Sequence, residues 1–356
     1  MKRRMAVLIC LLLALCAGGC AETFLISSDL HLTADGEAHE AVLAALRAAA
    51  QSVDAVILLG DNTNNARDLE HDRVKAFLAS LGRPAYVIPG NHDVTLDISD
   101  FIGLYADCGW SQAFSRDEAS ASCAVMTGGG TCLLLLDTND MQGCVAPLGG
   151  ISEGTCTWVK DTLSRLAEGT PVVACGHHPI LPAERWERTP GAAGLVDALS
   201  GVRLYLCGHD HGFAAVKVDG LQQITVGQPH AYPGWAGLLE VTEDAMRWQV
   251  LPLYSDQVRR EMRADAIALA EGMARGTLRD TPYADDEDAI QWFVDAFEAV
   301  MTSQLREDTC AAMLSAPAAR KWRRVETRTV VKRWIMGILE DCPQDVRRVD
   351  IRLSDR

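Results

Sequence analysis

Five apolar runs of this sequence end in aspartate, asparagine or histidine, and in four of them a glycine stands directly before the polar residues. A single ending of this kind is more often a turn residue or a helix cap than a ligand. Five endings of the same chemistry instead predict one metal site, because Asp, Asn and His bind Zn, Mn or Fe and the endings contain no cysteine for softer metals. The candidates are Asp29 and His31 (ISSDLHL), Asp61 (ILLGDNTNN), Asn91 and His92 (VIPGNHD), His177 or His178 (ACGHHP), and His209 and His211 (CGHDHG).

These candidates are too numerous for one tetrahedral ion. They suit two divalent ions (Mn, Zn or Fe) bridged by one carboxylate, an arrangement that holds the attacking and leaving oxygens in phosphoryl transfer. The glycines allow the backbone and the ions to approach closely at sharp turns. The set therefore predicts a dinuclear site and leaves the identity of the ions open.

The elements that must position these residues follow a βα rhythm from residue 23 to about residue 212, which is typical of an α/β domain. Strands are expected over 23–29, 53–61 and 84–93, with helices over 36–51 and 67–82 between them. Asp29, Asp61 and Asn91 are spaced by about one βαβ unit, ~30 residues. Parallel strands so connected bring their carboxyl ends together at one edge, where open α/β sheets place their sites.

Later in the chain the rhythm changes twice. A hairpin is expected over 122–138 and strands over 171–179 and 202–211, followed by several β-runs without helices between them. Those runs indicate that antiparallel strands complete the sheet and that a second sheet packs on it. From residue 255 onward only helical patterns are expected. We therefore divide the chain into residues 1–20, a catalytic domain over 21–254 and a helical C-terminal region over 255–356.

Residues 1–20 are typical of an export signal, with three basic residues at positions 2–4 and an apolar run that is short for a membrane span. A retained anchor helix is the alternative. The ending AGGC resembles the lipobox of bacterial lipoproteins, in which the cysteine, here Cys20, is lipidated. We expect an exported protein that is held at a membrane or cell surface through Cys20, or is otherwise secreted. Membrane contact is expected only through this N-terminal lipid or signal.

A formal net charge of −15 makes the chain a poor binder of nucleic-acid backbones, so the expected partner is a small-molecule phosphate ester. The chain has twelve cysteines, of which Cys132, Cys175 and Cys207 stand in apolar runs as expected of buried thiols. In an oxidising compartment others can pair. By proximity in the sequence the hypothesis is Cys108 with Cys123, Cys144 with Cys156, and Cys310 with Cys342.

The ordered motifs D-x-H, G-D, G-N-H-D, G-H-x-P and G-H-x-H resemble those of the calcineurin-like metallophosphoesterases, which include purple acid phosphatases, cyclic-nucleotide phosphodiesterases and acid sphingomyelinases. The resemblance covers about residues 23–253. It implies a four-layer α-β-β-α sandwich, here with a C-terminal helical appendage. Residues 255–356 resemble no family that we can name.

The resemblance also implies roles for the residues. Asp29, His31 and His211 would bind one ion, Asp61 would bridge, and Asn91, His177 and His209 would bind the other, with His178 as the alternative to His177. His92 would be the catalytic histidine and Asp93 its orienting neighbour.

The implied reaction is hydrolysis of a phosphate ester by a metal-bound hydroxide, and a phosphodiester is the favoured substrate. One alternative is a phosphomonoesterase acting on nucleotides or sugar phosphates. The other is a non-catalytic, metal-containing exported binding lipoprotein. The segment 226–235 offers His230, Tyr232 and Trp235 either as a pocket for a base or sugar or, as we favour, as ordinary aromatic packing.

Overall fold

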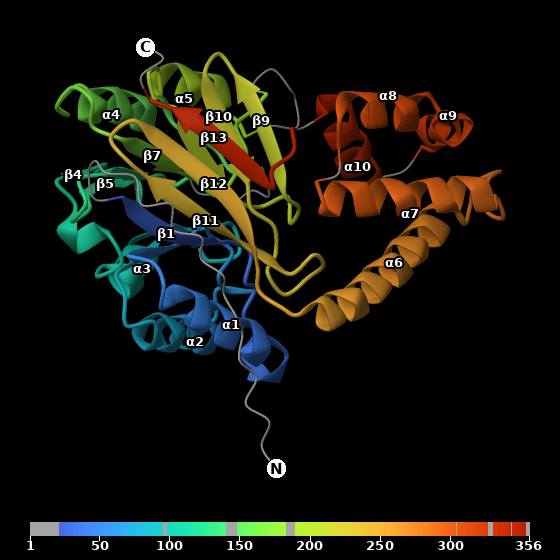
Figure 1. Cartoon of the computed structure of the whole chain (residues 1–356), viewed down its shortest axis with the longest axis horizontal. Helices are drawn as coiled ribbons and strands as arrows, with labels where there is room; N and C mark the ends of the chain where they lie inside the picture. The colour runs from blue at the N-terminus through green and yellow to red at the C-terminus, as the bar shows by residue number, and fades with distance from the viewer. Residues whose placement is uncertain are drawn as a thin grey trace.

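Two β-sheets face each other in the computed structural model, which describes residues 21–94, 98–139, 148–182, 189–303, 305–326, 330–342 and 344–353. Helices cover the outer face of each sheet, so the layers follow the order α-β-β-α (Figure 1). The expected α/β sandwich is confirmed.

The first sheet has six strands in the order β13-β12-β11-β1-β2-β3. Strands β1, β2 and β3 are parallel, with Ile26 opposite Ile57, and helices α1 and α2 connect them. The remaining three strands are antiparallel. Two of them, β11 and β12, lie in the β-runs that were predicted without helices between them, whereas β13 was not predicted. The elements are β1 (Glu22–Ser27), η1 (Gly36–His39), α1 (Glu40–Ala50), β2 (Ala55–Leu58), α2 (Asp68–Ser80), β3 (Ala85–Val87), α3 (Ile98–Tyr105), η2 (Trp110–Gln112), β11 (Trp235–Val241), β12 (Ala245–Pro252) and β13 (Arg348–Arg352).

The second sheet has seven strands in the order β4-β5-β6-β7-β8-β10-β9. Its centre is parallel, and α4 and α5 pack on its outer face. The elements are β4 (Ser115–Arg116), β5 (Cys123–Met126), β6 (Cys132–Leu135), α4 (Glu153–Leu163), β7 (Val172–Cys175), α5 (Ala192–Ala198), β8 (Leu204–Cys207), β9 (Ala214–Val218) and β10 (Leu221–Thr225).

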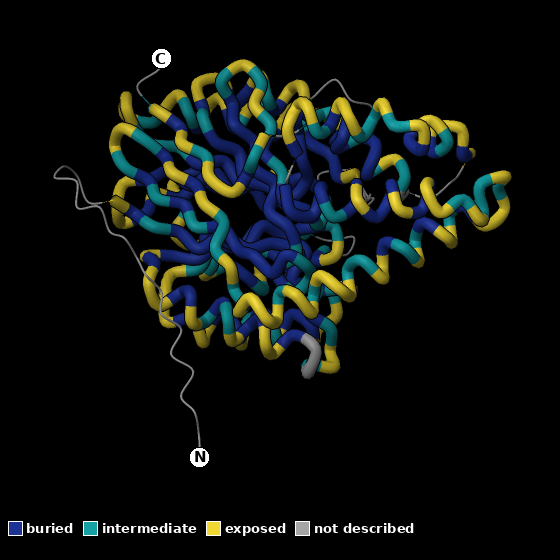
Figure 2. Tube along the Cα trace, turned by 45° about the vertical axis from the view of Figure 1, so that its right-hand side comes forward, coloured by how far each residue is buried: buried dark blue, intermediate teal, exposed yellow. Residues whose placement is uncertain are grey.

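The core lies between the sheets and beneath the helices, and Figure 2 shows this buried interior. In β1, Phe24 and Ile26 point into the layer between the sheets, whereas Leu25 points toward the helices of the first sheet. Successive strand residues alternate between faces, so a central strand covered on both sides must be apolar throughout. This explains why the strands that carry the polar endings are continuous apolar runs.

The C-terminal region forms five helices that pack around their own apolar cluster, to the right of the sheets in Figure 1. Phe293 and Trp322 stack at its centre, with ring centroids 4.8 Å apart. The N-caps of α6 and α7 are Ser255 and Asp286, whose side chains accept backbone N–H bonds. The helices are α6 (Asp256–Leu278), α7 (Glu287–Met301), α8 (Glu307–Ser315), α9 (Pro317–Arg324) and α10 (Val330–Asp341).

The expectation that residues 255–356 contain only helices is wrong at the end of the chain. Residues 348–352 form β13, which pairs with β12 and places Ile351 opposite Met246. The segment is short and most of its side chains are charged, as is common for a strand at a sheet edge. Trp248 on β12 helps to hold the end of the chain against the sheet, because its indole N–H donates to the Val346 carbonyl at 2.8 Å.

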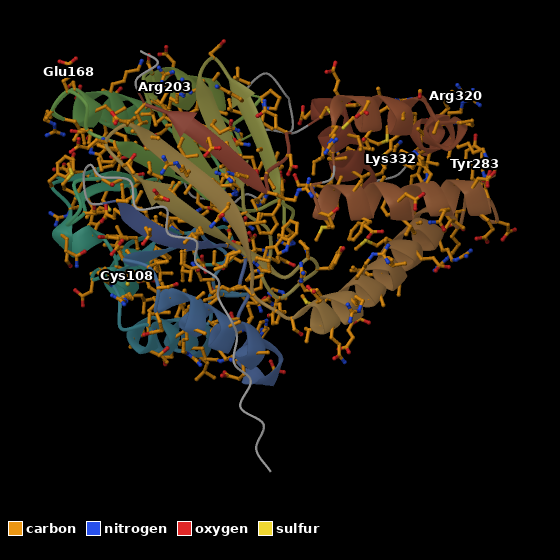
Figure 3. All side chains as sticks on the ribbon, in the orientation of Figure 1. Cys108, Glu168, Arg203, Tyr283, Arg320 and Lys332 are labelled. Atoms are coloured by element: carbon orange, nitrogen blue, oxygen red, sulfur yellow. The ribbon has the colours of Figure 1, made fainter. Side chains whose placement is uncertain are left out.

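The structure does not form the disulfides hypothesised within the described residues. Cys108, Cys123, Cys310 and Cys342 are all free thiols. Cys108 (Figure 3) packs beneath the helices of the first sheet, whereas Cys123 packs between the sheets, so the two thiols belong to different layers. Cys310 and Cys342 are neighbouring thiols in the helical cluster, without a bond between the sulfurs.

Several expectations fall outside the described residues. Cys144 lies there, and so do residues 1–20 with Cys20. Among the helices that the structure describes, none is both long and apolar enough to cross a bilayer.

Candidate metal centre

Five strand ends meet at one edge of the two sheets, where β1, β2 and β3 face β7 and β8. Backbone hydrogen bonds tie the five loops together: Asp29 N–H donates to the Gly60 carbonyl at 3.0 Å, and Gly208 N–H donates to the His177 carbonyl at 2.9 Å. The backbone N–H of His209 also lies 3.2 Å from both carboxylate oxygens of Asp29. Loops from both sheets are therefore joined where the predicted ligands stand.

Glycine is required before the ligands because atoms of neighbouring loops lie where a Cβ would stand. A Cβ on Gly90 would lie 2.2 Å from the backbone nitrogen and Oδ1 of Asp61. A Cβ on Gly208 would lie 1.9 Å from the Ser28 hydroxyl. Any larger residue at either position would displace the loop that carries a neighbouring ligand.

The backbone of the ligand loops is strained. Nine non-glycine residues in the described part of the chain have positive φ, and five of them are predicted ligands. Such conformations are uncommon outside glycine and gather at functional sites, where the surrounding structure holds them in place. The five are Asp29, His31, Asp61, His209 and His211.

The first predicted ligand group is assembled as expected. One potential ligand atom from each of its four residues lies within 4.8 Å of those of the others. The Nε2 atoms of His31 and His211 are 3.2 Å apart, and His211 Nε2 is 3.4 Å from Asp29 Oδ1. His31 Nε2 is 3.7 Å from Asp61 Oδ2. The group comprises Asp29, His31, Asp61 and His211.

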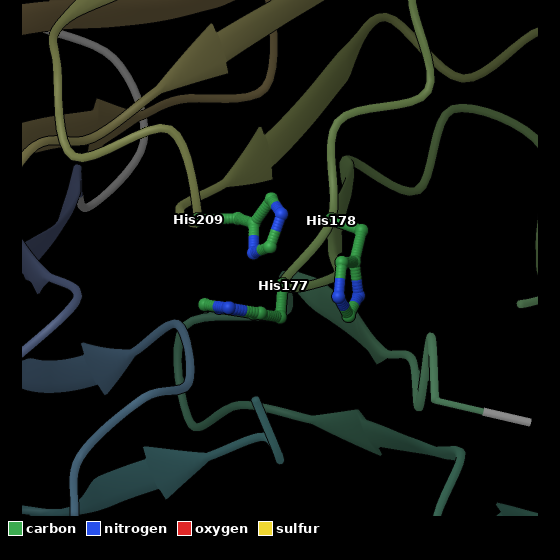
Figure 4. A group of neighbouring side chains, drawn as sticks. All are labelled: His177, His178 and His209. Atoms are coloured by element: carbon green, nitrogen blue, oxygen red, sulfur yellow. The ribbon is translucent and has the colours of Figure 1, made fainter. Parts of the chain in front are cut away.

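The second group lies on the other side of Asp61. Figure 4 shows His209 approaching from the loop after β8, and His177 with His178 from the loop after β7. One ring nitrogen of each lies within the same 4.8 Å limit. Asn91 joins them, with its Oδ1 3.1 Å from His209 Nδ1.

The position of Asp61 suits the bridging role. Its Oδ2 is 3.3 Å from His177 Nε2 in one group and 3.7 Å from His31 Nε2 in the other. Its Oδ1 accepts the His92 backbone N–H at 2.8 Å, which fixes the carboxylate. No other side chain among the described residues is common to both groups in this way.

His177 fits a ligand role better than His178. Its Nδ1 donates to the Leu59 carbonyl at 2.8 Å, so Nε2 is the atom that faces Asp61. A backbone carbonyl on one ring nitrogen commonly orients a histidine toward a metal with the other. His178 Nδ1 instead lies 2.7 Å from the Thr138 hydroxyl, and its Nε2 is buried without a partner in the described residues.

A cation fits the observed contacts. His177 Nε2 and the Asp61 carboxylate both accept protons, and they lie 3.3 Å apart. The Nε2 atom is fully buried and forms no hydrogen bond within the described chain. Two acceptors facing each other at this distance require a proton or a metal ion between them.

Burial keeps three predicted ligand histidines neutral, which is the form that binds metals. It lowers the pKa of His31 to about 3, of His209 to about 3 and of His211 to about 4. Burial also raises the pKa of Asp29 to about 8. A metal ion would therefore displace a proton from Asp29 at neutral pH.

The pKa values of Asp61 and His177 shift in the opposite direction from those of Asp29 and the three histidines. Burial opposes ionisation of Asp61, but the charge of His177 outweighs it and holds the pKa of Asp61 below its usual range. Burial likewise opposes the charge on His177, but Asp61 and then Asp29 outweigh it and raise the pKa of His177 to about 9. A proton on His177 thus occupies the place between these side chains that a cation would take.

His92 lies at the rim of the site, as expected of a residue that meets substrate. Its ring is 4.7 Å from that of His31, and its Nδ1 donates to the Asn64 carbonyl at 2.7 Å. The side chain is exposed, whereas the predicted ligands beside it are buried or half-buried.

Asp93 contacts other groups than the His92 ring that it was expected to orient. The Asp93 carboxylate is buried and accepts from the backbone N–H groups of Asn62, Thr63 and Gly90 at 2.7–3.1 Å. It therefore ties the loop after β2 to the loop after β3. Asn64, which no motif marked, orients the ring of His92 instead.

The sequence profile of the calcineurin-like phosphoesterases matches residues 22–213. The chain belongs to this family. Membership confirms the resemblance carried by the five motifs, and the profile ends just after the fifth of them. Residues 255–356 lie outside the match.

Curated relatives match about half of the chain. It is 26% identical to the 3',5'-cyclic adenosine monophosphate phosphodiesterase CpdA of Escherichia coli (strain K12), over 49% of this chain and 60% of that protein. It is 25% identical to the glycerophosphodiester phosphodiesterase GpdQ of Enterobacter lignolyticus (strain SCF1), over 49% of this chain and 62% of that protein. The match thus spans less than two thirds of either relative.

A solved structure has the same fold. A dimetal phosphatase from Danio rerio superposes with a TM-score of 0.50 at 17% identity, covering 66% of this chain and 97% of that one. The likeness agrees with the two-sheet sandwich described above.

The metal centre opens into a cavity of about 630 Å³. Asp61, His92 and His211 line it, and so do His230 and Tyr232. Trp235, considered with them in the sequence, packs instead between the sheets against Phe213, with ring centroids 5.5 Å apart. The remaining walls come from α6, α7 and α10, and no motif in the sequence predicted their contribution.

Proposed function

We propose that this chain is a metal-dependent hydrolase of phosphate esters and that phosphodiesters are its preferred substrates. The observation that supports this best is the pair of ligand groups that share Asp61. His92 lies beside them and lines the same cavity. Asp29, His31, Asp61 and His211 would hold one divalent ion, and Asn91, His177 and His209 with Asp61 the other. Bound there, such ions would neutralise the phosphoryl oxygens and make a water nucleophilic.

The chain's own residues supply positioning and proton transfer. The contact of Nδ1 with the Asn64 carbonyl fixes the His92 ring and leaves Nε2 to pass a proton to the departing ester oxygen. The backbone N–H of His92 meanwhile holds the Asp61 carboxylate. One short loop therefore positions both the shared ligand and the acid.

The charge of the cavity favours a diester over a monoester. Among the residues that the structure describes, no lysine or arginine lines it, whereas Asp210 and Asp265 do. A diester carries one negative charge and a monoester close to two at neutral pH, so a monoester would gain more from cationic side chains. The two relatives compared above are both named as phosphodiesterases, which agrees with this preference.

The test uses the purified chain, with metal content measured alongside turnover of bis(4-nitrophenyl) phosphate and 4-nitrophenyl phosphate. We expect hydrolysis that requires Mn or Zn, that a chelator abolishes, and that prefers the diester. Asp61→Asn should lose both ions and at least about 10³-fold in turnover, because the carboxylate serves both ligand groups. Asp161→Asn, an exposed change on α4, is the control.

Other outcomes of this test favour the alternatives. A preference for the monoester would indicate a phosphomonoesterase. Bound metal without turnover of either ester would indicate the binding-protein alternative.

We also propose that the protein is exported and anchored through Cys20, on the strength of the basic start, the apolar run and the AGGC ending. Cys20→Ala should move the protein from the membrane fraction to the soluble extracytoplasmic fraction. Both forms remaining in the cytoplasm would contradict export, and an unchanged membrane fraction would favour the retained anchor helix.

A further inference from the structure

The C-terminal helices build an apolar extension of the metal site. On α6, residues spaced by three or four positions face the cavity, so that one stripe of the helix lines it. Phe297 and Met301 of α7 and Trp334 of α10 line the same cavity. The α6 stripe consists of Met262, Ala266, Leu269 and Met273.

This wall leaves apolar side chains open to the cavity. Leu269 is 55% exposed, whereas Leu278, Leu305 and Leu339 of the same region are buried. Three methionines line the same space, and their flexible thioether chains adapt to ligands of variable shape. An exposed apolar surface continuous with a reaction centre indicates a binding region for an apolar group.

The size of the space agrees with a ligand site. Its volume of about 630 Å³ lies within the ~300–1,000 Å³ typical of pockets for small molecules. A phosphate alone would occupy only the part of the cavity beside His92 and His211. The rest of the cavity is available to the group that the phosphate carries.

The wall suits a flexible chain better than a nucleobase. A base in a specific site needs several placed hydrogen-bond partners. The cavity has such side chains in Gln228, His230 and Tyr232, but the described α6, α7 and α10 surface, which supplies much of the lining, offers mainly Met, Leu, Phe and Ala. The one polar side chain of the α6 surface, Asp265, is exposed. The Trp334 indole N–H is buried, so the ring contributes mainly apolar surface to the cavity.

From these observations, and resting on the proposed function, we infer that the site selects phosphodiesters that carry a flexible alkyl or acyl chain. The phosphate lies at the metal centre and the chain lies along the α6 stripe. In the reaction the water oxygen bonds to phosphorus, one P–O ester bond breaks, and the departing oxygen takes a proton. The products are an alcohol and a phosphate monoester.

The test compares methyl 4-nitrophenyl phosphate with octyl 4-nitrophenyl phosphate on the metal-loaded full chain. Release of 4-nitrophenolate gives kcat/KM for each. Each methylene buried in an apolar site contributes roughly a fourfold gain, so partial burial of the octyl chain should raise kcat/KM at least about 100-fold. Equal values for the two esters would overturn the inference.

Two variants locate the effect. Leu269→Asp puts a charge in the α6 stripe, at an exposed position where folding should tolerate it, and should reduce the octyl-to-methyl ratio at least about tenfold. Leu69→Asp makes the same change at a leucine on α2 that is 65% exposed and outside the cavity lining, and it should leave the ratio unchanged. A ratio that falls equally in both variants would contradict a role for α6.

Binding separates this inference from the proposed function. Calorimetry with octylphosphonate and methylphosphonate should show tighter binding of the octyl compound by the unaltered protein, and a smaller difference in Leu269→Asp. No turnover of any ester would contradict the proposed function, whereas equal binding of the two phosphonates would contradict the apolar region. A nucleoside phosphodiester that is hydrolysed better than the octyl ester would also overturn it.

Discussion

Two regions line the same cavity: the sheet edge, where the predicted ligands follow β1, β2, β3, β7 and β8, and the helical wall formed by α6, α7 and α10. They differ in almost every physical respect. The edge consists of polar side chains that are largely buried, carried on strained backbone and held within a few ångströms of one another. The wall consists of apolar side chains on regular helices, some of them exposed. The edge fixes which atoms react, and the wall fixes what those atoms are attached to, so chemistry and substrate choice reside in different parts of the chain.

The largest effect that distinguishes the regions should come from His92, which belongs to the edge without belonging to either ligand group. His92→Ala removes the proposed proton donor and should lower turnover by about 10²–10⁴-fold. Metal content should stay unchanged, in contrast to Asp61→Asn, because no ligand is lost. Metal analysis and kcat on the same preparation provide the measurement.

A parallel loss of metal and turnover in His92→Ala would mean that this histidine is a ligand or a support of the loop. A 4-nitrophenolate leaving group needs little protonation, so an ester with an alkyl leaving group should show the larger loss. If both leaving groups suffer equally, His92 does not act as the acid.

The edge could be predicted almost entirely from sequence because its chemistry is local. Each ligand follows its own strand within a few residues, and the βαβ spacing of Asp29, Asp61 and Asn91 places the strand ends together. The glycines at positions 90 and 208 signalled close approach, and the structure shows what they approach. The contacts of Asp93 and Asn64 could not be predicted, because they depend on how two loops meet.

The wall could not be predicted because an amphipathic pattern gives a helix an apolar face without showing what the face covers. Leu269 on the cavity side of α6 and Ala270 on the side packed against other helices are both simply apolar in the sequence. The strand β13 was missed for a similar reason, because its five residues gain their β character from pairing with β12. Tertiary packing determines these features.

An intermediate effect should come from the centre of the helical cluster. Trp322 is buried, stacks on Phe293 and donates its indole N–H to the Ala289 carbonyl at 2.8 Å. Trp322→Ala should destabilise the helical region by about 3–5 kcal/mol through the cavity it leaves. Since no metal ligand lies in that region, metal content should persist while the octyl-to-methyl preference falls. Thermal unfolding followed with metal analysis tests this, and simultaneous loss of metal would show that the two regions fold as one unit.

The smallest effect should come from Asp286, which is the N-cap of α7 in the helical region. It accepts the Ala289 N–H at 3.0 Å and pairs with Lys321 of α9. Asp286→Ala should cost about 1 kcal/mol in the free energy of unfolding. Asp286→Asn keeps a good cap and loses only the ion pair, so it should cost a few tenths of a kcal/mol.

The pH dependence of these variants shows which interaction matters. The hydrogen bond from Lys321 lowers the pKa of Asp286, so the unfolded state binds the proton more readily than the folded state. The stability from the charged form is therefore complete above the unfolded pKa of about 4 and is lost as pH falls through the lower folded value. Denaturant unfolding at pH 7 and pH 3 should show a gap between wild type and Asp286→Asn that narrows in acid. A gap that is the same at both pH values would mean that the ion pair with Lys321 contributes nothing to stability and that Asp286 acts only as the N-cap of α7.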